Sequence, residues 1–257
     1  MKHTFFLHWG PGGNAQFERV HFSNTAQTKN ILWWDQPAGT SPSLNKVLEA
    51  SSAQLLAQHE NTKEKIALLG HSFGGWAAIH LANRHPDLVS SVTLLGTCTS
   101  PSLGFVALAK RVLEANPANE GFGSSIVNFE AAPASLDAFG QMMGEMVQIP
   151  TFREHYWAPE SKAIMEDFFA APHPPLDPQT FFALMKDVLE SGFPAPKLSV
   201  PASIPTRVIL GTSDPFHRRL DSETEWKKTV PHCEVIWTKK AGHFVHLETD
   251  PANWCPA

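Results

Sequence analysis

The chain has 257 residues, 42% of them hydrophobic, and its formal net charge is -5 at pH 7. This length and apolar content suit one α/β domain with an insertion better than two domains of equal size. The negative charge and the lack of any block of lysine and arginine argue against nucleic acid or an anionic membrane as the main partner. A small neutral molecule is the partner that this composition favours.

Short β-rich runs alternate with helical patterns over much of the chain. Such alternation is typical of a parallel sheet that helices cover on both faces, so we predict an α/β fold with one continuous, mostly parallel sheet. The runs expected to form strands are residues 4–8, 30–34, 65–69, 91–96, 206–210 and 234–237.

The alternation stops after Thr97 and resumes near Pro205. The sequence in between is rich in Phe, Met, Pro and Ala, and its helical patterns cover residues 105–115, 136–147, 161–170 and 178–191. We therefore predict a helical lid over residues 100–201, inserted into a core made of residues 1–99 and 202–257. A proline-punctuated segment, 193–205, would lead back to the core.

Hydropathy gives no sign of a targeting segment or a membrane span. The apolar run between Met1 and His8 is too short for a signal peptide, and no later segment approaches a spanning length. We therefore expect a cytoplasmic protein, as a monomer or a homodimer. The three cysteines are too few and too scattered for a disulfide framework or a zinc site, so reduced thiols are expected at Cys98, Cys233 and Cys255.

The segment from Gly70 to Gly75 carries the strongest functional signal. It contains the pattern G-x-S-x-G, centred on Ser72, between the predicted strand 65–69 and a helix-like run over 76–82. At a strand-to-helix junction this pattern is a nucleophile elbow, whose tight turn presents the serine hydroxyl at the helix N-terminus. The alternative is a glycine-rich turn in which the serine only caps the helix.

A serine hydroxyl is a weak nucleophile unless a base takes its proton and a third group orients that base. Asp214 follows a predicted strand, at the sheet edge where ligands collect, although an aspartate there can also serve only to cap a turn. His243 follows the last predicted strand, and Gly242 before it permits a sharp approach to the serine. We predict Ser72, Asp214 and His243 as catalytic residues, with His246 as the rival base. A metal held by the two histidines lacks a third ligand of suitable spacing, so no metal site is predicted.

Hydrolysis also needs hydrogen-bond donors for the oxyanion that develops on the substrate. The backbone N–H of Phe73, directly after the serine, is the expected first donor. The glycine-rich exit of the first strand, residues 8–13, is expected to supply the second donor from Gly10, with Trp9 as its rival. The alternative for this segment is a tight turn with no catalytic role.

These motifs resemble those of the α/β-hydrolase superfamily, over the chain from about His3 to Glu248. The resemblance implies the fold, a Ser-His-Asp triad and independence from cofactors, and a serine nucleophile disfavours dehalogenase and epoxide-hydrolase chemistry. Residues 8–12 and 35–41 are similar to the HGGPG and DQxGxGxS segments of proline iminopeptidase-like members. Within the second segment, Asp35 is interpreted as a structural turn former.

The two ends of the sequence differ from the pattern of that superfamily. The first predicted strand already leads to the glycine-rich segment, and neither a leading β-hairpin nor a closing C-terminal helix is apparent. Residues 30–34 would then lie at an exposed sheet edge, which is a site for dimerisation or aggregation.

Together these features predict a cofactor-independent serine hydrolase, foremost a carboxylesterase that cleaves a small apolar ester through an acyl-enzyme. The alternatives with similar machinery are a proline iminopeptidase-like aminopeptidase, a C–C bond hydrolase and a thioester hydrolase. An aminopeptidase would need an acidic lid residue facing the pocket, for which the candidates are Glu154, Glu160 and Glu166. Lyases, cofactor-free dioxygenases and non-catalytic binding proteins are alternatives of other classes.

Overall fold

A parallel sheet forms the centre of the computed structural model, which describes residues 3–37, 42–172, 177–193 and 199–256. Its six strands in this part of the chain are β1 (Thr4–Leu7), β2 (Ile31–Trp34), β3 (Ile66–His71), β4 (Val89–Leu95), β5 (Thr206–Gly211) and β6 (Glu234–Thr238). Their order across the sheet is β2-β1-β3-β4-β5-β6, and every neighbouring pair is parallel. Each strand begins and ends within two residues of its expected limits. The prediction of an α/β fold with one continuous sheet is therefore confirmed.

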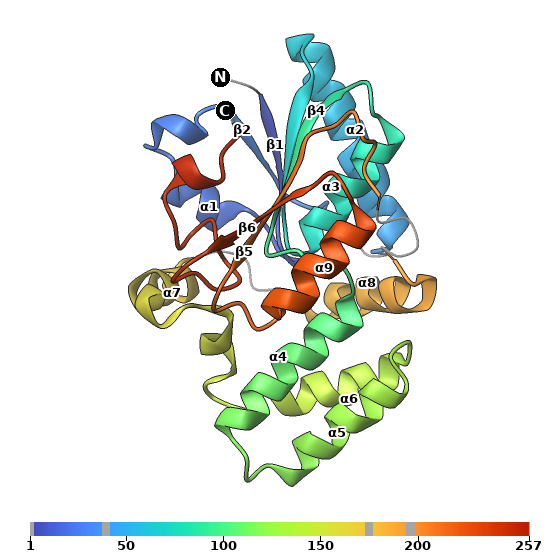
Figure 1. Ribbon diagram of the computed structural model, residues 1–257, viewed down its shortest axis with the longest axis vertical. Helices are drawn as coiled ribbons and strands as arrows, with labels where there is room; N and C mark the ends of the chain where they lie inside the picture. The colour runs from blue at the N-terminus through green and yellow to red at the C-terminus, as the bar shows by residue number, and fades with distance from the viewer. Residues whose placement is uncertain (1–2, 38–41, 173–176, 194–198, 257) are drawn as a thin grey trace.

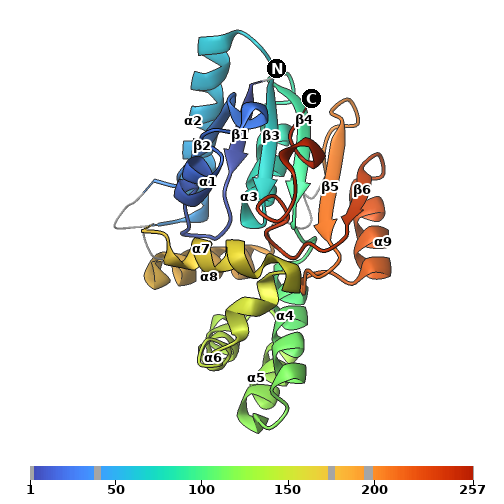
Figure 2. The same ribbon diagram turned by 90° about the vertical axis from the view of Figure 1, so that its left-hand side faces the viewer.

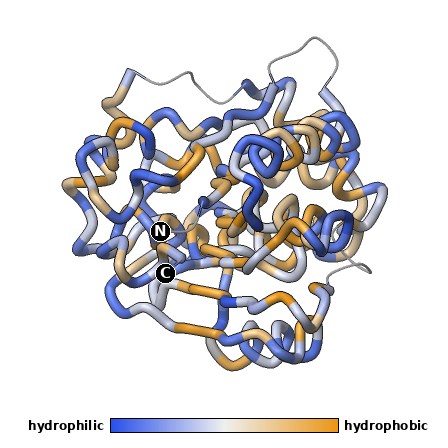
Figure 3. The backbone as a smooth tube through the Cα atoms, turned by 90° about the horizontal axis from the view of Figure 1, so that it is seen from above, coloured by the Kyte–Doolittle hydropathy of each residue, from blue (hydrophilic) through white to orange (hydrophobic). Residues whose placement is uncertain are grey.

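Buried side chains on the two faces of the sheet belong to two separate cores. On one face, α2 (Leu44–Thr62), α3 (Phe73–Arg84) and α9 (Arg219–Thr229) pack with strand residues Phe5, Leu68, Leu94 and Val208. On the other face, α1 (Gln16–His21) and the chain around η4 (Pro251–Asn253) pack with Phe6, Leu69, Leu95 and Ile209. Helices or loops cover both faces of the sheet (Figure 1), so the inner strands β1 and β3 are buried along their whole length and are mostly apolar. Seen from above, many of the hydrophilic stretches lie along the outline of the molecule (Figure 3).

Strand β2 lies at one edge of the sheet, where residues 30–34 were expected, and β6 lies at the other edge. The short helix η1 (Ala26–Thr28) leads into β2. Aromatic packing covers both faces of this edge strand: the ring of Trp33 stacks on Phe22 at a centroid distance of 5.7 Å, and Trp34 meets Phe5 edge-on at 5.9 Å. The backbone edge of β2 stays unpaired within the sheet.

A block of helices lies between β4 and β5 in the sequence and beyond the carboxyl ends of the strands in space (Figure 2). It comprises α4 (Pro101–Ala115), α5 (Glu120–Ala131), α6 (Leu136–Met146), η2 (Phe152–Tyr156), η3 (Pro159–Ser161), α7 (Lys162–Ala170) and α8 (Pro178–Ser191). Four of these helices lie where helical patterns were expected, although α4 begins earlier because Ser100 caps it. None of the helices in the described ranges is long and apolar enough to cross a membrane.

Helix α5 is absent from the sequence-based expectation. Gly121 and Gly123 lower the helix propensity at the start of this segment and lie just after the turn-like residues 116–119, so the start of the helix resembles a loop. The apolar spacing that marks the helix is nonetheless present, since its inward face consists of the buried residues Phe122, Ile126 and Phe129. Tertiary packing against α4 and α6 therefore outweighs weak local propensity here.

The turn between β3 and α3 depends on very close backbone contacts. A Cβ atom on Gly74 would lie 2.0 Å from the carbonyl oxygen of Leu7, at the carboxyl end of β1. No side chain fits in that space, so the first turn of α3 can rest directly on the end of the neighbouring strand. This contact fixes the position of Ser72, which immediately precedes the helix.

We expect Gly74→Ala to lower the free energy of unfolding by about 3 kcal/mol or more, because backbone atoms on both sides must move apart. Gly144→Ala is the matched control, since a Cβ there meets nothing within 4 Å. That control should be neutral or stabilising by about 0.5–1 kcal/mol through helix propensity. Urea unfolding of both variants measures the difference, and equal stabilities would contradict the close-contact account of the turn.

Candidate active site

Ser72 lies at the sharp turn between β3 and α3, at the carboxyl end of the sheet. Its backbone has φ 53° and ψ -117°, a conformation that residues with a side chain rarely adopt. Such strain persists only where the surroundings impose it, as the contact of Gly74 with β1 does here. The Ser72 side chain lines a cavity of the described structure.

Three side chains from distant parts of the chain form a hydrogen-bonded row in the order Asp214, His243 and Ser72. Asp214 follows β5, and His243 lies in the loop after β6. The Nδ1 atom of His243 is 2.9 Å from Oδ2 of Asp214, and its Nε2 atom is 3.0 Å from Oγ of Ser72. A carboxylate can only accept, so Nδ1 donates to it and Nε2 is left to accept the serine proton. The structure thus brings together the three residues that the sequence analysis selected.

Asp214 is buried, with 2% of its surface exposed, and its surroundings favour the ionised form. Burial alone would raise the pKa of Asp214, but the imidazoles of His243 and His217 outweigh this effect and hold the pKa below its ordinary value. The second imidazole, with Nε2 3.5 Å from Oδ2, was not anticipated from sequence. The Phe216 N–H also donates to Oδ1 at 2.9 Å. A charged carboxylate is what the row requires to orient and stabilise the imidazole.

The loop that carries His243 is fastened to the inserted helices. The N–H of His243 donates to the carbonyl of Tyr156 at 2.6 Å. The carboxylate of Glu248 accepts from the N–H groups of Gly242 and Ala158, at 2.9 Å and 2.8 Å. A Cβ on Gly242 would lie 2.4 Å from the Tyr156 carbonyl oxygen, so a glycine is needed for this approach. The role of the glycine was expected from the sequence, whereas the clamp made by the glutamate was not.

Gly96, directly after β4, leaves space for the hydrogen-bonded row of Asp214, His243 and Ser72. Gly96 has φ 56°, and a Cβ on it would lie 2.6 Å from the His243 carbonyl oxygen and 3.4 Å from Oδ2 of Asp214. The ring of Phe216 stacks on the imidazole of His243 at a centroid distance of 4.4 Å. A small residue on one side and a flat ring on another therefore hold the imidazole in place.

The expected oxyanion donors also lie around the serine. Phe73 is the first residue of α3, so its N–H has no partner within the helix. Trp9 and Gly10 follow β1 and, like Phe73, line the same cavity as Ser72. The structure thus brings all the predicted donors to one site.

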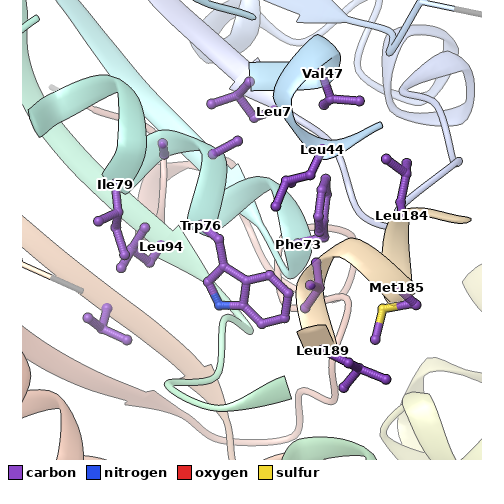
Figure 4. Packing of buried hydrophobic residues seen from close by; sticks show 14 of the residues in the cluster. Leu7, Leu44, Val47, Phe73, Trp76, Ile79, Leu94, Leu184, Met185 and Leu189 are labelled. Carbon is purple, nitrogen blue, oxygen red and sulfur yellow. The ribbon is translucent and has the colours of Figure 1, made fainter. Parts of the chain in front are cut away.

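The cavity has a volume of about 750 Å³ and lies between the sheet and the inserted helices. Its wall is mostly aromatic and apolar, with rings that include Phe105, Phe152, Phe168, Phe181, Phe182 and Phe216. Figure 4 shows how this wall is supported: Phe73 and Trp76 of α3 lie opposite Met185 and Leu189 of α8. Cys98, also in the wall, is half-buried, and desolvation of its thiol raises the pKa to about 12 and keeps it protonated.

His246, the rival base, makes no hydrogen bond to the serine. It is fully buried, and its Nε2 is 3.2 Å from Oε1 of Glu18. His71 lies beside it, at a centroid distance of 4.5 Å, and donates from Nε2 to the carbonyl of His243 at 3.0 Å. Burial lowers the pKa of His71 well below its ordinary value, so this imidazole is neutral. Through these contacts, His246 and His71 anchor the loop that carries His243 to α1 and to the end of β3.

Glu18, His71 and His246 are the described residues that could hold a metal ion, because each offers a ligand atom within 4.8 Å of the others. Two imidazoles and a carboxylate suit a divalent transition metal. The set differs from the pair considered in the sequence, since His243 is not part of it. Only the fold brings Glu18 from α1 to this place, so the spacing along the chain carries no signal for it.

Asp35, interpreted as a structural residue, has structural contacts. It accepts from the N–H of Ala15 at 2.7 Å and pairs with Arg19 at 2.6 Å, which ties α1 to the end of β2. The next residue, Gln36, accepts from the N–H of Gly12 at 2.7 Å. The two segments that are similar to proline iminopeptidase-like proteins therefore touch each other. The rest of the second segment, from Ala38 on, lies outside the described residues.

Comparisons with known proteins agree with this architecture. A family model described as "Alpha/beta hydrolase family" matches residues 31–255. No curated protein sequence matches the chain at a significant level.

Similar folds occur among solved structures. An N-acyl homoserine lactone degrading enzyme is 22% identical with a TM-score of 0.58, over 97% of this chain and 89% of that one. A proline iminopeptidase-related protein from Thermus thermophilus is 18% identical with a TM-score of 0.65, over 96% of this chain and 84% of that one. A thermophilic esterase from Thermogutta terrifontis is 20% identical with a TM-score of 0.56, over 95% and 84% of the two chains. These likenesses show the fold, and with the family match and the parallel sheet they establish that the chain belongs to the α/β-hydrolase family.

Proposed function

We propose that this hydrolase is a serine carboxylesterase that works without a cofactor through an acyl-enzyme. The observation that carries the proposal is the hydrogen-bonded row of Asp214, His243 and Ser72, which ends in an apolar cavity. An unstrained helix cap would not need the backbone conformation of Ser72, whereas an attacking hydroxyl does.

In the proposed reaction His243 takes the proton of the Ser72 hydroxyl while the oxygen attacks the ester carbonyl. Asp214 holds the imidazole in the tautomer with the proton on Nδ1 and stabilises its charge. The N–H of Phe73 and one N–H from the segment of Trp9 and Gly10 stabilise the oxyanion. The imidazole then protonates the leaving alcohol. In the second half His243 takes a proton from the water that attacks the acyl-enzyme and returns it to Oγ of Ser72 as the acid is released.

The cavity favours a bulkier acyl part than the small ester expected from sequence. A volume of about 750 Å³ lies within the range that holds drug-sized ligands, and the mainly aromatic wall suits an aryl or medium-chain acyl group. Some solved structures of similar fold are described as esterases, which agrees with the proposed reaction class.

An aminopeptidase is disfavoured by the positions of the acidic residues. A substrate amine needs a carboxylate in the pocket, yet none of the described residues that line the cavity is acidic. Glu160 pairs with Lys240, and Glu166 pairs with Lys162. Glu154 is exposed and does not line the cavity. Lyase and dioxygenase chemistry is disfavoured, because it would give the strained serine no role. A C–C bond hydrolase or a thioester hydrolase would form the same kind of acyl-enzyme as the proposed esterase.

Ser72→Ala is expected to abolish turnover of p-nitrophenyl butyrate and labelling by a fluorophosphonate, because Ser72 is the hydroxyl bonded to the imidazole. Mass spectrometry of the labelled wild-type protein locates the modified residue. Ser124→Ala, at an exposed position of α5 outside the cavity, serves as control and should retain both properties. Stoichiometric labelling of another residue, with Ser72 unmodified, would contradict the proposal.

Asp214→Asn should keep the fold and lower kcat by a factor on the order of 10⁴, because the amide no longer holds the proton on Nδ1 of His243. Circular dichroism checks the fold. The matched control is Asp221→Asn, since this aspartate is exposed and pairs with Arg218 far from the row. A loss of tenfold or less in Asp214→Asn would remove Asp214 from the proposed mechanism.

Filling the cavity should change the acyl preference. Val147 lines the cavity from the end of α6 and is 45% exposed, so Val147→Trp can be accommodated and narrows the space. We expect the ratio of kcat/KM for p-nitrophenyl octanoate over the acetate to fall about tenfold or more. Val127→Trp, at an exposed site outside the cavity, should leave that ratio unchanged. Equal ratios in both variants would mean that the acyl group lies elsewhere.

A further inference from the structure

Arg153 is an unusual member of the cavity wall. It lies in η2, among the inserted helices, and is exposed to solvent. Apart from the titratable His243, it is the one ionisable base among the described residues that line the cavity. A cation at the rim of a mostly aromatic wall is a feature that a neutral apolar ester does not use.

Two aromatic rings hold the guanidinium in place. Its central carbon is 5.2 Å from the ring centroid of Phe169 and 5.9 Å from that of Phe152. Both rings line the cavity as well. Contacts of this kind order the side chain while leaving its N–H donors free for a further partner.

No carboxylate of the described residues forms an ion pair with Arg153. The carboxylates of Glu160 and Glu166, which follow Arg153 in the sequence, pair instead with Lys240 and Lys162. The N–H donors of the guanidinium are therefore available to water or to a bound anion. A planar carboxylate is the anion whose two oxygens match the guanidinium fork.

We propose that Arg153 binds a carboxylate on the substrate, so that the preferred substrates are esters with a bulky apolar acyl part that ends in a carboxylate. The inference rests on the proposed function, because the ester end of the same molecule lies at Ser72. The acyl chain fills the aromatic cavity, and the carboxylate lies at the rim, where it stays partly solvated. The alternative is that the guanidinium only packs on the two phenylalanine rings.

Two esters of equal length separate these alternatives: p-nitrophenyl octanoate and the mono-p-nitrophenyl ester of octanedioic acid. For Arg153→Met the ratio of kcat/KM for the acidic ester over the neutral one should fall about tenfold, through KM, because a charge-assisted hydrogen bond is lost. Arg153→Lys should keep a large part of the ratio. Lys162→Met, which removes an exposed charge outside the cavity, is the control and should keep all of it.

An unchanged ratio in Arg153→Met would overturn the proposal, and so would an equal fall in Lys162→Met, which would indicate a general field effect. Calorimetry measures binding in parallel for two proteins, Ser72→Ala and the double variant Ser72→Ala with Arg153→Met. The two ligands are the monomethyl ester of octanedioic acid and methyl octanoate. This measurement does not depend on hydrolysis. If wild-type protein hydrolyses neither ester but Arg153→Met weakens binding of the acidic ligand alone, the proposed reaction is wrong and the carboxylate site stands. If both ligands bind equally well to both proteins, the carboxylate site is wrong.

Discussion

The approach of the first turn of α3 to the end of β1 is the contact on which the active site depends. At Gly74 the two backbones come so close that no side chain fits between them. At this turn Ser72 adopts a strained backbone conformation, and apolar packing of α3 against β3, β4 and α2 offsets the strain. The same contact places the residues after β1 beside the N-terminus of α3, where an oxyanion would develop. One packing constraint therefore positions both the proposed nucleophile and its proposed oxyanion donors.

The remaining parts of the site are brought in by the topology of the sheet. Since all the strands are parallel, the residues that follow β3, β5 and β6 meet at one edge, and the row of Ser72, Asp214 and His243 forms there. The imidazole is then fixed from several sides, by the clamp of Glu248, by the stacked ring of Phe216 and by the small Gly96. The inserted helices take part in this clamp through Ala158, so the apolar cavity and the polar row are mechanically connected.

Local patterns in the sequence predicted a large part of this arrangement. The strands and the elbow are encoded in contiguous residues, as apolar runs and as the G-x-S-x-G pattern, and the order of serine, acid and histidine followed from the positions of the strands. Other features depend on contacts between distant segments and leave no local trace. Glu18 looks like an ordinary helix residue until the fold buries it against His246, and His217 becomes a neighbour of Asp214 only through the shape of the turn. Helix α5 was missed because its glycines weaken the local signal that packing later overrides.

The central claim is that Ser72 becomes covalently acylated during turnover. Rapid quenching of the reaction with a slowly hydrolysed p-nitrophenyl ester, followed by intact-mass and peptide analysis, measures this directly. The account predicts a transient gain equal to the mass of the acyl group, located on Ser72, that decays as the free acid is released. Full turnover with no acyl group on the protein, together with near wild-type turnover by Ser72→Ala, would contradict the account and leave the fold assignment standing.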